Sequence, residues 1–197
     1  MKVQCIRRLL DNGLDFALYR FPGEKEPHLV LQTEGEAGVL CQKQDTCDIA
    51  TTTHYNPLNE PSGFVFAPFT ETAKTPTLLI KPNIAVSGWE LIDLETSSLK
   101  RHRRVSLSSI ELDDRTLPID EHDGYKVAFR SFKNQLDREH YQKLVLSFSQ
   151  LKDWEGADHE DELFIRAMDR FPNSMVYLVY TRTGGRWFGC TPELLLE

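Results

Sequence analysis

The sequence predicts an α+β fold with a largely antiparallel sheet and flanking helices. Three observations favour this class: short apolar runs that turn residues separate, two amphipathic helical stripes, and a glycine pair between two strand-like runs. With 197 residues, the chain is long enough to bury a hydrophobic core as one large domain or two small ones.

The first part of the chain predicts one helix and several short strands. Val3 to Leu10 has the pattern of a short helix that ends at Asn12-Gly13, a common C-terminal stop signal. The strand candidates that follow lie at 16–19, 29–31, 63–69, 78–80 and 84–94. We expect a loop at 51–62 and a mobile connector, rich in Ser, Asp, Glu and Arg, at 95–123.

The last third predicts a helix, a strand, a second helix and a hairpin. Tyr125, Phe129, Phe132 and Leu136 recur at helical spacing, and the apolar run KLVLSFSQ at 143–150 is typical of a buried strand. A second helix is expected from about Asp158 to Pro172, with the acidic run His159 to Glu162 as its solvated start. Residues 175–190 then predict a hairpin around Gly184-Gly185, where a primed turn requires positive φ.

Composition excludes several classes of function. The net charge of −7 argues against a general nucleic-acid binder or a protein of anionic membrane surfaces. No apolar run reaches the roughly 18 residues of a membrane span, and the N-terminus does not have the pattern of a signal peptide. Four cysteines without a CxxC pair favour the reducing cytoplasm.

Lys143 is the first residue whose charge is out of place. In the predicted strand, alternation puts Lys143, Val145 and Ser147 on one face, so the amine points into protein if both faces are covered. Burial lowers the pKa of a lysine toward neutrality, as a general base requires. The alternative is a lysine at the edge of a sheet whose amine reaches water.

Glu193 is the second such residue. Pro192 restricts the backbone before it, and the apolar run Leu194 to Leu196 follows it. Apolar surroundings raise the pKa of a carboxyl group into the range of a general acid. The alternative is an ordinary glutamate in the first turn of a helix, with Thr191 as its N-cap.

Taken together, the two segments resemble a known family. KLVLSFSQ resembles the K-V-V-L-S-R signature of chorismate-utilising enzymes, and FGCTPELLL resembles their F-x-G-[AS]-[ST]-P-E-L-L stretch. Lys143 and Glu193 lie fifty positions apart, the interval of the isochorismate synthase members. GFVFAPF at 63–69 resembles the family's upstream Phe-x-x-Pro-Phe segment, and Phe148 stands where the family has an arginine. The resemblance covers about 60–197 and is strong only from 125 onward.

The resemblance implies a reaction and a small-molecule substrate. Isochorismate synthases add water at C2 of chorismate and expel the C4 hydroxyl, with Mg2+ on the substrate carboxylate. It implies that Lys143 activates the water and that Glu193 protonates the leaving hydroxyl. Relatives that use ammonia do not carry this lysine, which favours water as the nucleophile. A salicylate synthase of the same family, or a domain that keeps the motifs for binding or regulation, are the alternatives.

The resemblance also implies a domain organisation. Residues 124–197 would begin the catalytic core, and 1–123 would be a variable N-terminal part. In the family the chain continues for about as long again and supplies the Mg2+ ligands. We therefore expect this chain to be an N-terminal half, inactive alone, in menaquinone or siderophore biosynthesis. Its apolar C-terminal strand is expected to promote self-association.

Overall fold

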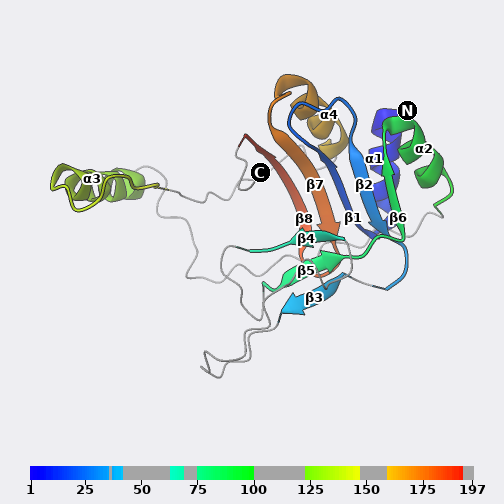
Figure 1. Cartoon of the computed structure of the whole chain (residues 1–197), viewed down its shortest axis with the longest axis horizontal. Coiled ribbons are helices and arrows are strands. Elements are labelled where there is room, and N and C mark those ends of the chain that lie inside the picture. Colours follow the sequence, from blue (N-terminus) through cyan, green and yellow to red (C-terminus); the bar gives the residue numbers. More distant parts are fainter. Residues whose placement is uncertain (36, 42–62, 69–74, 100–122, 147–158, 193–197) are drawn as a thin grey trace. The chain divides into compact units, whose positions relative to one another are not determined.

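A computed structural model describes residues 1–35, 37–41, 63–68, 75–99, 123–146 and 159–192 (Figure 1). The chain divides into two compact units, one formed by 1–107 with 158–197 and the other by 108–157. The described residues form four helices and two antiparallel sheets, which confirms the α+β class.

The larger sheet has five strands and belongs to the first unit. Its order is β6-β2-β1-β7-β8, and every neighbouring pair is antiparallel. The bounds are β1 (Asp15–Arg20), β2 (His28–Gln32), β6 (Ile84–Ser87), β7 (Met175–Thr181) and β8 (Gly185–Thr191). The sheet therefore joins segments from both ends of the chain, with β1 at its centre.

Three helices pack on one face of this sheet: α1 (Lys2–Asn12), α2 (Trp89–Ser97) and α4 (Glu160–Arg170). Alternate residues of β1, such as Phe16 and Leu18, are fully buried beneath them, together with Phe164 of α4. As predicted, α1 ends at Gly13, which adopts the left-handed conformation with φ of 67°.

A smaller sheet packs against the other face. It has the order β3-β5-β4, from β3 (Gly38–Cys41), β4 (Phe64–Phe66) and β5 (Thr77–Ile80). Leu78 and Ile80 of β5 lie in one buried cluster with Ala17, Val30 and Val179 of the larger sheet. Because both faces are covered, β1 is buried almost throughout, including its charged ends.

The second unit is described at 123–146 and contains α3 (Asp123–Asp137). The helical stripe predicts this helix correctly. The rings of Tyr125 and Phe129 lie 6.3 Å apart, and Lys133 forms an i, i+4 ion pair with Asp137 at 2.9 Å. Tyr125 and Phe129 remain exposed.

Three predictions within the first unit need correction here. The connector expected at 95–123 does not begin at 95, because α2 continues to Ser97, while 100–122 lie outside the described residues. The strand expected at 84–94 ends at Ser87, because Gly88 turns the backbone with φ of 90° and α2 begins at the next residue. The hairpin has a three-residue loop rather than a two-residue turn, since Thr181 pairs with Gly185. Positive φ was expected for the glycine pair, and of the two only Gly185 has it, with φ of 77°.

Candidate functional site

Lys143 does not lie in a strand. Residues 143–146 are neither helix nor strand, and the lysine side chain is exposed rather than buried. A strand needs a neighbour for its backbone N–H and C=O groups, and among the described residues no strand pairs with this segment. The predicted burial of Lys143 is therefore wrong for this structure, while 147–150, the rest of the predicted strand, lie outside the described residues.

Glu193 lies outside the described residues. Its motif begins within them, because Cys190 and Thr191 are the last residues of β8 and pair with Val176 and Met175 of β7. Lys143 belongs to the second unit and Glu193 to the first. Their approach to one shared substrate stays a prediction, and so does the acid role of the glutamate.

The acidic start of α4 is not solvated, contrary to the prediction. Glu160 is 5% exposed and Asp161 is 1% exposed. Arg7 of α1 donates from Nε to Asp161 Oδ2 at 2.5 Å, and Arg186 of β8 donates from its guanidinium to Glu160. The two ion pairs tie the N-terminal turn of α4 to a helix and to a strand, so burial is possible because each carboxylate has a cation.

A cavity of about 350 Å³ lies beside these ion pairs. Its lining includes Arg7, His159, Glu160, Asp161 and Arg186. The one signal of these ion pairs in the sequence is Arg7, a charged residue next to the buried positions of the amphipathic helix α1. The pairing itself follows from tertiary contacts between positions 154 residues apart.

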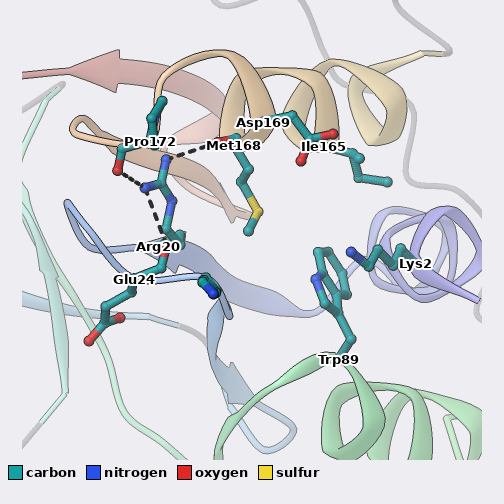
Figure 2. A pocket seen from close by; sticks show the side chains of 9 residues that line it. Lys2, Arg20, Glu24, Trp89, Ile165, Met168, Asp169 and Pro172 are labelled. Carbon is teal, nitrogen blue, oxygen red and sulfur yellow. Dashed lines mark hydrogen bonds between the residues drawn. The ribbon is translucent and has the colours of Figure 1, made fainter.

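Arg20 is the largest fully buried side chain of the described residues, and its guanidinium binds the end of α4 (Figure 2). It donates to the carbonyl oxygen of Phe171 at 2.7 Å and to that of Pro172, with longer contacts to three further carbonyls. A helix leaves its last carbonyls without partners and concentrates negative charge there, so a cation is stabilised. Arg20 therefore caps α4 from the neighbouring strand.

A second cavity, of about 260 Å³, lies next to this cap (Figure 2). Trp89, Ile165 and Met168 supply its apolar lining, and the ammonium of Lys2 lies 5.5 Å from the centre of the Trp89 ring. That contact is a cation–π interaction within the protein. The side chain of Lys2 thus already covers a face of the Trp89 ring.

Cys5 is a buried thiol that a carboxylate of α2 holds in the protonated form. Its Sγ donates to Asp93 Oδ1 at 3.2 Å, and the same carboxylate oxygen accepts a bond from Arg8 at 2.8 Å. Burial, followed by the hydrogen bond and charge of Asp93, raises the pKa of Cys5 to about 11. The hydrogen bonds from Cys5 and Arg8 hold the pKa of Asp93 below its ordinary value. Such a thiol is a poor nucleophile.

The described residues do not fit the Mg2+ ion that the resemblance implies. They contain no cluster of three or more His, Cys, Asp or Glu side chains that could hold a metal ion. The buried carboxylates of Glu160 and Asp161 each face an arginine, whose charge already satisfies them.

Comparison with protein-family models, with curated proteins and with solved structures found no match. No helix among the described residues has the length and apolar character to cross a membrane.

Proposed function

We propose that this chain carries the base and the acid of an isochorismate synthase. The observation that carries the proposal is the pair of motifs, KLVLSFSQ and FGCTPELLL, in family order with Lys143 and Glu193 fifty positions apart. A single short motif would be weak support, whereas two in register, with GFVFAPF upstream, are more specific.

The helix before the first motif, and the helix and hairpin between the two motifs, give further support. The proposal expects a helix before the lysine, then a helix and a hairpin that lead to the glutamate. Helices α3 and α4 and the hairpin of β7 and β8 lie at those positions. The hairpin ends at Thr191, so the Thr-Pro-Glu sequence follows directly from a strand of the larger sheet.

The proposed reaction needs one proton acceptor and one proton donor. Lys143 takes a proton from water while the water oxygen bonds to C2 of chorismate. The ring double bonds shift, the C4–oxygen bond breaks, and Glu193 gives its proton to the departing hydroxyl. The net result moves a hydroxyl from C4 to C2, and a second proton exchange with solvent restores both side chains.

The exposure of Lys143 places a condition on this proposal. A general base must lie within hydrogen-bond reach of the proton that it takes, in a site from which bulk water is excluded. Substrate binding must therefore cover the amine before it can act. Product formation, rather than the structure of the free protein, is the test.

The experiment uses the natural-length protein that contains these residues, with chorismate and Mg2+, and separates the products by liquid chromatography. Isochorismate is expected, and Lys143→Ala and Glu193→Gln should each lower kcat by about 100-fold or more. Lys133→Ala, which removes an exposed lysine of α3, is the matched control and should leave kcat unchanged. Salicylate as the first product would indicate the salicylate-forming relatives. Chorismate binding without turnover would indicate a binding or regulatory domain.

A further inference from the structure

His28, Ser87 and Glu24 form a hydrogen-bonded chain in the first unit that the proposed function does not use. His28 of β2 and Ser87 of β6 are direct partners in the antiparallel register. Ser87 Oγ lies 2.7 Å from His28 Nδ1, and Glu24 Oε2 lies 2.5 Å from His28 Nε2. One nucleophilic hydroxyl, one imidazole and one carboxylate thus follow one another within hydrogen-bond distance.

The carboxylate of Glu24 determines which group donates in each of these two hydrogen bonds. An ionised carboxylate only accepts hydrogen bonds, so Nε2 of His28 must carry the proton that points at Glu24. In the neutral imidazole the other nitrogen, Nδ1, is then the acceptor, and Ser87 donates its hydroxyl proton to it. This is the polarity that a serine nucleophile requires from its general base.

The three side chains are accessible, and an aromatic surface adjoins them. Ser87 is exposed, and the side chains of His28 and Glu24 are 26% and 45% exposed. Tyr19 stacks on the imidazole with ring centres 5.3 Å apart, and the Phe21 ring lies 5.5 Å from it. Phe21 is 44% exposed, so a planar aromatic group could pack there beside the serine.

The backbone donors next to the serine limit the chemistry. The N–H of Gly88 donates to Pro27 O at 2.8 Å, and the N–H of Trp89 donates to Glu26 Oε2 at 3.1 Å. Neither can stabilise an oxyanion without giving up its present partner. The serine is therefore suited to esters with an acidic leaving group, whose acyl transfer needs less stabilisation.

We propose that Ser87, with His28 as its base and Glu24 as a positioning residue, is a nucleophilic site for activated aryl esters. Ser87 Oγ bonds to the acyl carbon and its proton passes to His28 Nδ1. The aryl oxygen leaves as a phenol with that proton. Water then attacks the acyl-serine, gives a proton to His28, and releases a carboxylic acid, after which the proton returns to Ser87. The inference rests on neither Lys143 nor Glu193.

The test combines covalent labelling with turnover on the full chain. A fluorophosphonate probe followed by peptide mass spectrometry should label Ser87, and p-nitrophenyl acetate should be hydrolysed faster than in buffer. Ser87→Ala should remove both signals, and His28→Gln should lower both by about 100-fold. Ser98→Ala is the matched control, because this exposed serine bonds only to the carbonyl of Glu95, and it should change neither.

A second readout separates the role of Glu24 from a structural one. Glu24→Gln keeps an acceptor for Nε2 but removes the negative charge that favours the imidazolium, so kcat should fall about tenfold or more while KM stays unchanged. The proposal is overturned if the probe labels Ser87 no more than Ser98, if Ser87→Ala hydrolyses the ester at the rate of the unaltered chain, or if Glu24→Gln changes KM alone.

Discussion

Replacement of Arg20 by methionine should strongly destabilise the first unit. The side chain is 1% exposed and lies between β1 and the last turn of α4. Methionine keeps much of the apolar stem but removes every donor. The carbonyls of Phe171 and Pro172, which accept the two closest bonds, would then be left without this partner.

The magnitude follows from those two bonds. A hydrogen bond from a charged donor contributes about 1.5–3 kcal/mol to stability. Each carbonyl keeps a backbone donor, the N–H of Ser174 for Phe171 and the N–H of Gly23 for Pro172. The replacement therefore removes two charged hydrogen bonds without leaving either oxygen unpaired, which gives a loss of about 3 kcal/mol. The three contacts of 3.4–3.5 Å add little. Arg20→Lys should lose about half as much, because an ammonium is a compact donor without the planar fork that reaches two carbonyls.

Urea denaturation followed by tryptophan fluorescence measures the effect as a lower midpoint at an unchanged slope. Arg166→Met is the matched control, since Arg166 lies on α4 but is 79% exposed and pairs only with Glu162 at 3.2 Å. It should cost less than about 0.5 kcal/mol. A loss below about 1 kcal/mol for Arg20→Met, or one equal to that of the control, would refute the assignment of Arg20 as the cap of α4.

Two further predictions concern buried polar groups. Asp15 is 1% exposed, and its carboxylate accepts hydrogen bonds from the backbone N–H groups of Ala37 at 2.5 Å and Arg182 at 2.8 Å. Asp15→Asn turns an amide donor toward one of these N–H groups, so it should lower the free energy of unfolding by about 2 kcal/mol in the same denaturation assay. An unchanged midpoint would contradict this. With its pKa raised from 9.0 to about 11, Cys5 is only about 1% thiolate at pH 9, so iodoacetamide should modify the exposed Cys190 while Cys5 stays unmodified in peptide maps. Equal modification of the two in the folded chain would show that Cys5 is not held as a buried thiol.

Local sequence signals predicted much of the secondary structure. The stop signal at Gly13, the stripe of α3 and the hairpin with Gly185 all depend on residues within one element, and each is confirmed. The prediction that the strand at 84–94 continues past Ser87 was wrong. The apolar residues run on from the strand into α2, so they hide the change from the strand period to the helix period. Gly88, with its positive φ, was the signal that could have ended the predicted strand.

The polar core could not be predicted in the same way. A charged residue such as Asp161 is expected at the surface, because burial of an unpaired charge is costly. Only a cation from another element compensates that cost. The pairing of Asp161 with Arg7, and of Arg20 with the end of α4, joins segments from opposite ends of the chain. For the candidate site, the motifs predicted Lys143 and Glu193 as partners, but burial of the lysine depended on a strand that the described segment does not form.

Isotope transfer from water tests the central claim most directly, because that claim is that water attacks chorismate under the control of Lys143. The natural-length protein is incubated with chorismate and Mg2+ in H2(18)O, and the product is analysed by mass spectrometry. The account predicts isochorismate with one (18)O atom, at the C2 hydroxyl, and no such product from Lys143→Ala. Isochorismate without the label, or labelled product formed equally well by Lys143→Ala, would contradict it.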